Sequence, residues 1–159
     1  MLPLNNIKVL IPRPVGQATE FSEKLTKLGA TPIVFPLIKV EAINKDNLKS
    51  TVQNNEFDWI IFTSSVAVQF FFNTIKKEEI KAKIAVVGTS TKKEVENLGL
   101  KVDFTPSAAT AKKLVKEIPV TKDDKILIPR SEIAGKGVIA ILEKRKVNVT
   151  EIATYSNTP

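Results

Sequence analysis

Residues 59–65 read Trp59-Ile60-Ile61-Phe62-Thr63-Ser64-Ser65, four large apolar residues followed at once by three hydroxyl residues. A strand in which every residue is apolar is typical of the interior of a parallel sheet, because helices cover both of its faces. A strand of a half-exposed antiparallel sheet would alternate apolar and polar residues instead. The stretch therefore predicts an α/β fold, with hydroxyl residues at the carboxyl end of a central strand.

The alternation of short apolar strands and amphipathic helices extends outward from this stretch over the whole chain. The predicted strands cover residues 7–12, 33–40, 59–63, 84–87, 101–104, 126–128 and 149–154. The predicted helices cover residues 17–28, 46–53, 65–75, 91–98, 109–118 and 137–146. The first helix places Ala18, Phe21, Leu25 and Leu28 at helical spacing and ends at Gly29. The pattern predicts a parallel sheet with helices on both faces.

The composition limits the chemistry that the chain can perform. The 159 residues suffice for one ordinary domain, and the 43% apolar content is enough to bury a core. The absence of His and Cys excludes a histidine base, a thiolate nucleophile, a His or Cys zinc site and a disulfide framework. Acid–base chemistry must therefore come from carboxylates, lysines, hydroxyls, backbone groups or the single tyrosine, Tyr155.

The formal charge of +7 suggests an anionic partner. Much of the excess lies in residues 111–146, where Lys112, Lys113 and Lys116 alternate with Leu114 and Val115 as on a solvated helix face. Because no basic and aromatic platform is present, we expect a small polyanion and no nucleic acid. Nucleic-acid binding stays open as an alternative, with a steep salt dependence as its signature.

The start of the chain does not resemble a signal peptide, and no apolar run approaches the roughly 20 residues of a membrane span. We therefore expect a cytoplasmic protein without membrane contact.

One short segment recurs in the sequence. Residues 9–13 read Val-Leu-Ile-Pro-Arg and residues 126–130 read Ile-Leu-Ile-Pro-Arg, each followed by a predicted helix. This recurrence indicates βαβ units from two similar domains, although strand–turn–helix sequences also resemble one another by chance. A lone βαβ unit cannot cover its own apolar faces. We expect residues 1–36 to be a fragment of a first domain, residues 37–155 a complete second domain, and residues 153–159 the start of a return linker.

Polar residues follow the predicted strands, at the edge where open parallel sheets bind ligands. The candidate binding residues are Arg13, Thr63, Ser64, Ser65, Gly88, Thr91, Arg130 and Ser131. Each also has a structural explanation, since Ser64, Ser65, Ser90 and Thr91 can cap helices and Arg130 can form a surface ion pair. Gly88-x-x-Thr91 lacks the glycine pattern of a nucleotide site. Together they predict a surface that binds carboxylates or phosphates through hydroxyls, arginines and backbone N–H groups.

The ordered set of motifs resembles the uroporphyrinogen-III synthase family over nearly the whole chain. The motifs that carry the resemblance are Arg13-Pro14, Leu28-Gly29, Pro36-Leu37-Ile38, Phe57–Ser64, Ala67-Val68, Val87-Gly88-x-x-Thr91, Gly99-Leu100, Pro106, Thr110, Leu114-Val115, Pro129-Arg130-Ser131, and Tyr155 near Thr158-Pro159. The chain departs from the family in lacking the segment that returns to complete the first domain.

The resemblance implies two flavodoxin-like domains, joined by a two-stranded linker, with the active site in the cleft between them. It implies an enzyme that cyclises hydroxymethylbilane to uroporphyrinogen III, with inversion of ring D and loss of water, and it implies no cofactor and no metal. Tyr155 matches the tyrosine that helps the hydroxyl leave, and Ser64 and Thr91 match residues that contact substrate carboxylates. We expect a monomer with little activity in this form. The alternative is a non-catalytic flavodoxin-like module that binds a polyanionic small molecule.

Overall fold

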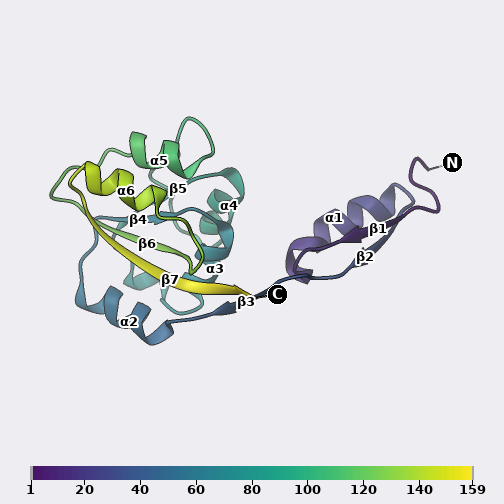
Figure 1. Cartoon of the computed structure of the whole chain (residues 1–159), viewed down its shortest axis with the longest axis horizontal. Helices are drawn as coiled ribbons and strands as arrows, with labels where there is room; N and C mark the ends of the chain where they lie inside the picture. The colour runs from purple at the N-terminus through teal and green to yellow at the C-terminus, as the bar shows by residue number, and fades with distance from the viewer. Residues whose placement is uncertain (1, 159) are drawn as a thin grey trace. The chain divides into compact units, whose positions relative to one another are not determined.

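The computed structural model describes residues 2–158. The chain divides into two compact units (Figure 1). Unit 1 consists of Met1–Glu41 with Asn157–Pro159, and unit 2 consists of Ala42–Ser156.

Unit 1 is built around a single βαβ motif. Strands β1 (Lys8–Ile11) and β2 (Thr31–Val34) are parallel and flank helix α1 (Val15–Lys27). The helix ends before Gly29, whose φ of +93° lies in the left-handed region that glycine adopts without strain. The buried core of the unit comprises Ile11, Ala18, Leu25 and Ala30. Phe21 and Leu28, which recur at helical spacing with Ala18 and Leu25, are 46% and 43% exposed.

The prediction of one strand over residues 33–40 is wrong. The structure has two strands here, β2 and β3 (Lys39–Ala42), separated by a non-regular segment. Pro36 lies in that segment, and a proline has no N–H for a strand ladder and favours extended or turn geometry in the residue before it.

The larger sheet has five strands in the order β3-β7-β6-β4-β5. Strands β4 (Trp59–Phe62), β5 (Lys83–Val86), β6 (Lys125–Ser131) and β7 (Asn148–Thr158) are joined by parallel pairings. The chain passes from β4 to β5 on one side, then crosses to the other side of β4 to form β6 and β7. This reversal is the switch point of a doubly wound α/β sheet. The predicted fold class, α/β with a mostly parallel sheet, is confirmed.

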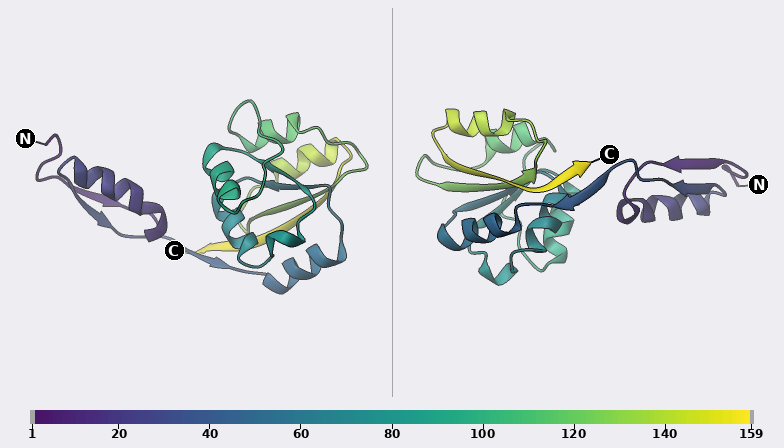
Figure 2. Two further views of the ribbon diagram at one scale, coloured as in Figure 1. Left: turned by 180° about the vertical axis from the view of Figure 1, so that it is seen from behind. Right: turned by 60° about the horizontal axis from the view of Figure 1, so that its bottom comes forward.

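Helices cover both faces of this sheet (Figure 2). They are α2 (Lys45–Asn54), α3 (Ser65–Phe72), α4 (Thr89–Asn97), α5 (Ala111–Glu117) and α6 (Gly137–Lys144). Trp59 and Ile61 of β4 pack in one buried cluster with Leu114 of α5 and Leu142 of α6. On the other face the Phe62 ring meets the Phe71 ring of α3 edge to face, with 5.4 Å between centroids. Burial on both faces explains why the strand is apolar throughout.

The strand predicted at residues 101–104 is wrong, because only Phe104 forms a bridge, to Ala85 of β5. The Asp103 carboxylate accepts the Ile84 N–H at 3.0 Å, so a side chain takes the place of a ladder partner. Burial raises the pKa of Asp103, but this backbone hydrogen bond and Lys101 outweigh it, and the net pKa lies below the usual value. The helix predicted to Ile75 ends at Phe72, and a short 3₁₀ helix, η1 (Lys77–Glu79), follows.

Within residues 2–158, no helix combines the length and the apolar character needed to cross a bilayer.

Candidate functional site

The candidate site lies at the carboxyl edge of the sheet, where β4 and β6 stop pairing. Their ladder covers only Trp59 opposite Ile126 and Ile60 opposite Leu127, whereas β6 stays paired with β7 as far as Ser131. Thr63, Ser64 and Ser65 follow β4 directly, and Ser131 ends β6. The two segments therefore flank the switch point, which is the position where open α/β sheets bind ligands.

Two hydroxyl groups meet at this edge. The Tyr155 hydroxyl of β7 lies 3.3 Å from Ser64 Oγ, and either group can be the donor. The Tyr155 ring stacks on Phe70 of α3, with 5.5 Å between centroids and 19° between planes, and Tyr155 is 8% exposed. Packing thus fixes the phenol ring and leaves its hydroxyl beside the residues that follow β4. The sequence alone does not single out Phe70, because three phenylalanines follow one another at residues 70–72. Its neighbour Phe71 lies in the core at 0% exposure.

Ser64 has a structural role as well. Its Oγ accepts the Ala67 N–H at 3.1 Å, so Ser64 is the N-cap of α3, and this capping prediction is confirmed. Ser65 is already the first residue of that helix, so its predicted capping role is wrong. Ser64 therefore joins the start of α3 to the tyrosine of β7.

Helix α4 follows β5, the strand next to β4 in the sheet. Its N-cap is Gly88, with no capping side chain, and the first intrahelical bond runs from the Lys92 N–H to the Gly88 carbonyl. The predicted caps Ser90 and Thr91 are therefore wrong, because both lie inside the helix, and Thr91 is only 3% exposed. The uncapped first turn directs its N–H groups and its positive dipole end toward the carboxyl edge.

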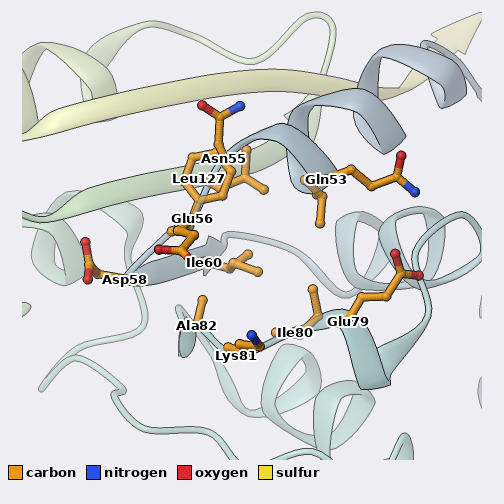
Figure 3. Close-up of a pocket in the computed structure, with 12 residues that line it drawn as sticks. Gln53, Asn55, Glu56, Asp58, Ile60, Glu79, Ile80, Lys81, Ala82 and Leu127 are labelled. Carbon is orange, nitrogen blue, oxygen red and sulfur yellow. The ribbon is translucent and has the colours of Figure 1, made fainter.

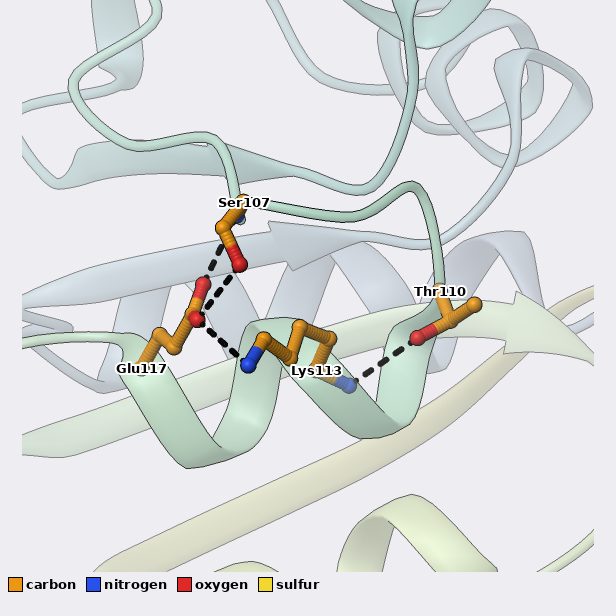
Figure 4. A network of polar contacts seen from close by, with 4 residues as sticks. All are labelled: Ser107, Thr110, Lys113 and Glu117. Atoms are coloured by element: carbon orange, nitrogen blue, oxygen red, sulfur yellow. Dashed lines mark hydrogen bonds and ion pairs between the residues drawn. The ribbon is translucent and has the colours of Figure 1, made fainter.

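A polar network holds the loop that follows Phe104 (Figure 4). The Ser107 N–H and hydroxyl each donate to the Glu117 carboxylate at 2.7 Å, and Lys113 Nζ lies 3.0 Å from the same group. The backbone hydrogen bond from Ser107 is the main reason that the pKa of Glu117 falls to about 2. A side chain on Gly88 would place its Cβ 3.8 Å from Ala109 of this loop. The network therefore fixes a loop next to the start of α4.

Arg130 turns away from the hydroxyl residues. Its side chain is 7% exposed, its Nη1 lies 3.2 Å from Glu151 Oε1, and its Nη2 donates to the Gly135 carbonyl at 2.7 Å. The ion pair considered from the sequence exists, but the arginine lies in the interior and not on the surface. The guanidinium thus contacts the loop before α6 and strand β7.

Arg13 belongs to unit 1 and is exposed just after β1, where its N–H donates to the Ile11 carbonyl at 2.9 Å.

A separate pocket of about 480 Å³ lies at the amino end of the strands (Figure 3). Ile60 and Leu127 contribute to its lining, together with the charged side chains of Glu56, Asp58, Glu79 and Lys81. Asp58 is engaged there, since its carboxylate accepts the Lys125 N–H at 2.8 Å. Across residues 2–158 no three His, Cys, Asp or Glu side chains gather closely enough to hold a metal ion. This pocket contains none of the residues predicted from the sequence.

Comparison with known proteins identifies the family. The family model described as uroporphyrinogen-III synthase HemD matches residues 19–159. The chain is 33% identical to the chloroplastic uroporphyrinogen-III synthase of Oryza sativa subsp. japonica, over 93% of this chain and 52% of that protein. It is 31% identical to the porphyrin biosynthesis protein HemD of Ruminiclostridium josui, over 97% of this chain and 32% of that protein.

Solved structures of that name share the fold. A mutant uroporphyrinogen-III synthase from Thermus thermophilus superposes with a TM-score of 0.65 at 18% identity, covering 96% of this chain and 63% of that chain. The chain thus spans about half of the rice relative and less than two thirds of the Thermus protein. Because the family model matches residues 19–159, which are most of this chain, the chain belongs to the uroporphyrinogen-III synthase family.

Proposed function

We propose that this chain supplies one side of the site at which hydroxymethylbilane is cyclised to uroporphyrinogen III. The observation that carries the proposal is the contact between Ser64 and Tyr155 at the switch point of the sheet. Family membership supports the same reaction. A linear tetrapyrrole with many carboxylates also suits a chain of formal charge +7.

Tyr155 is the proposed proton donor. Its phenol proton passes to the hydroxyl group of the substrate, the C–O bond breaks, and water leaves from a carbon that the adjacent pyrrole stabilises as a cation. The ring D carbon that already carries the bridge to ring C then attacks this cation to form the spiro intermediate. Its bond to that bridge breaks, which leaves a second cation stabilised by pyrrole ring C. The other α-carbon of ring D attacks this second cation, and the proton lost from that carbon returns to the tyrosinate, so that the macrocycle closes with ring D inverted. A weak acid suffices for such a leaving group, so positioning of the substrate provides most of the rate.

The substrate carboxylates are the proposed ligands of the carboxyl edge. Thr63, Ser64 and Ser65 offer hydroxyls and backbone groups there, and Gly88 leads into the uncapped turn of α4. Ser131 ends β6 at the same edge and is 9% exposed, so it is proposed to contribute there from a buried position. Thr91, which is 3% exposed, and Arg130, which is bound to Gly135 and Glu151, are proposed to support this edge from inside. For Arg13, in unit 1, carboxylate binding stays a prediction from the sequence.

Unit 1 is proposed to be part of a second α/β domain. Its two-stranded sheet leaves Leu10 and Ile33 exposed, at 59% and 43%, on the face that α1 does not cover. Further strands and helices of the same domain would bury these residues.

Nucleic acid is not a proposed partner. On α5, the helix at the start of the basic segment 111–146, Lys113 already pairs with Glu117, and Leu114 and Val115 are buried. The cytoplasmic location and the monomeric state stay predictions from the sequence.

Binding is the direct test of the proposed site. Uroporphyrinogen III, the product, is added anaerobically to ¹⁵N-labelled protein, and backbone amide shifts are recorded. We expect shifts at residues 63–65, 88–91 and 131, and none at residues 53–58 of the amino-end pocket, which serve as an internal control. Shifts confined to that pocket, or no shifts at millimolar product, would contradict the proposal.

Catalysis is tested with Tyr155→Phe. Hydroxymethylbilane that is not enzymatically cyclised closes to uroporphyrinogen I, so the ratio of the two isomers reports the enzymatic route. If the chain forms isomer III, we expect Tyr155→Phe to lower that rate by roughly a hundredfold, as for loss of a general acid. Thr150→Val, on the same strand, is the matched control and should keep the wild-type ratio. An unchanged rate in Tyr155→Phe would remove the tyrosine from the mechanism.

A further inference from the structure

The ladder between β6 and β7 contains an irregularity next to Tyr155. Arg130 pairs with Ala153, but the next residue, Ser131, pairs with Tyr155, so Thr154 is an extra residue in β7. An extra residue of this kind is a β-bulge, and bulges change the direction of side chains near functional sites.

The bulge determines which face of the sheet carries Tyr155. Val149 packs with the cluster beneath α5 and α6, and Ile152, three residues on, lies on the opposite face by alternation. Continued alternation would return Tyr155, three residues after Ile152, to the α5 and α6 face. Instead the extra residue places Tyr155 opposite Ser131, on the face of α3, where it contacts Phe70 and Ser64.

Four contacts of β6 and the loop after it hold the bulge in place. The Thr154 hydroxyl donates to the Arg130 carbonyl at 3.4 Å, and Thr154 is 2% exposed. The Glu132 N–H donates to the Tyr155 carbonyl at 3.0 Å. The Arg130 side chain binds Glu151 of β7 on one side of the bulge and the carbonyl of Gly135 beyond β6. These contacts thus link β6, the bulged part of β7 and the loop before α6.

We propose that this bulge aims the Tyr155 hydroxyl at Ser64, and that Thr154 and Arg130 are the positioning residues that maintain it. The consequence for catalysis rests on the proposed function, whereas the consequence for the direction of Tyr155 does not. The sequence alone does not single out Thr154, because its role depends on pairing between distant strands.

The single tyrosine allows a test without any activity measurement. Its ring resonances in the NMR spectrum of the 159-residue protein report the stacking on Phe70, which should displace them from their free positions. Thr154→Val removes the hydroxyl at nearly constant volume, so the fold should persist. Thr150→Val is the matched control, because Thr150 lies in the regular part of the same ladder, opposite Leu127.

In Thr154→Val we expect the tyrosine resonances to move toward their free positions, and the Glu132 amide to lose protection from exchange by roughly two- to tenfold, the value of one hydrogen bond. Thr150→Val should leave both signals unchanged. Unchanged signals in Thr154→Val, or equal changes in both variants, would overturn the proposal.

Arg130→Lys provides a second variant, because a lysine keeps the charge but cannot reach Glu151 and Gly135 together. It should move the tyrosine resonances in the same direction as Thr154→Val. Isomer-III formation is then compared in the same proteins. Displaced resonances with unchanged isomer III would uphold the bulge and contradict the catalytic role of Tyr155, so the two proposals fail separately.

Discussion

The two units of the chain use similar sequence to reach different degrees of burial. Counted over residues 2–158, unit 2 buries twenty-four apolar or aromatic side chains, whereas unit 1 buries four. The exposed large apolar residues among residues 2–158 show the reverse, since unit 2 has only Ile133 and the others belong to unit 1. Those of unit 1 are Leu2, Ile7, Leu10, Val15, Phe21, Leu28, Ile33, Phe35, Leu37 and Ile38. A βαβ motif forms locally, but a core requires further layers.

The recurring Ile-Pro-Arg segment shows the same contrast at one residue. Arg130 is 6% exposed because β7 and the loop before α6 surround it, whereas Arg13 is exposed. The arginine of the same tripeptide thus forms an interior ion pair in one unit and lies at the surface in the other. The difference teaches that the role of such an arginine is set by the elements that follow it.

A core deletion in unit 2 should have the largest effect. Phe71 is fully buried between the rings of Phe62 and Phe72, so Phe71→Ala should lower the free energy of unfolding by about 3–5 kcal/mol. Urea unfolding followed by the fluorescence of Trp59, the single tryptophan, measures this loss. Phe21→Ala in unit 1 is the matched control and should change the value by less than about 0.5 kcal/mol. Equal losses would show that the two units share one core.

Acid should weaken unit 2 through the Ser107 and Glu117 contact. The pKa of Glu117 is lowered from 4.5 to about 2, so its stabilisation is complete above pH 4.5 and is lost as the pH falls toward 2. Wild type should therefore exceed Glu117→Gln in stability at neutral pH, with the difference shrinking between pH 4.5 and 2. Glu20→Gln, which removes an exposed pair with Lys24 in unit 1, is the control and should show no such trend. A difference that is constant with pH would contradict the assigned cause.

Polar substitution on the bare face of unit 1 should have the smallest effect on unfolding. Leu10 is 59% exposed, so Leu10→Ser should leave the Trp59 transition within about 0.5 kcal/mol of wild type. The same variant should bind less of a dye that reports exposed apolar surface. A large destabilisation would show that Leu10 is covered in solution.

The sequence predicted the elements whose pattern depends on local burial. The strand at Trp59–Phe62 and the helix after Ser64 follow from periodicity and capping, and the structure places both as expected. Periodicity failed where a side chain or a proline replaces a ladder bond, as Asp103 does beside β5 and Pro36 does after β2.

The candidate site could be predicted only as a set of strand ends. The sequence predicts its residues because parallel strands end at one edge, but the contact of Ser64 with Tyr155 depends on the bulge at Thr154. A bulge leaves no local signal, because it arises from the pairing of two segments that are separate in the sequence. The burial of Arg130 against Glu151 arises from the same pairing.

Pro129, in the middle of β6, has a consequence for how the edge stays open. The Lys125 carbonyl accepts the Asp58 N–H just before β4, so by alternation the backbone groups of residues 127 and 129 also face β4. At residue 129 that side has no N–H to offer, because proline carries none. The ladder between β4 and β6 therefore cannot continue beyond Leu127 through a hydrogen bond from the backbone of residue 129. No regular ladder therefore joins the hydroxyl residues that follow β4 to the end of β6.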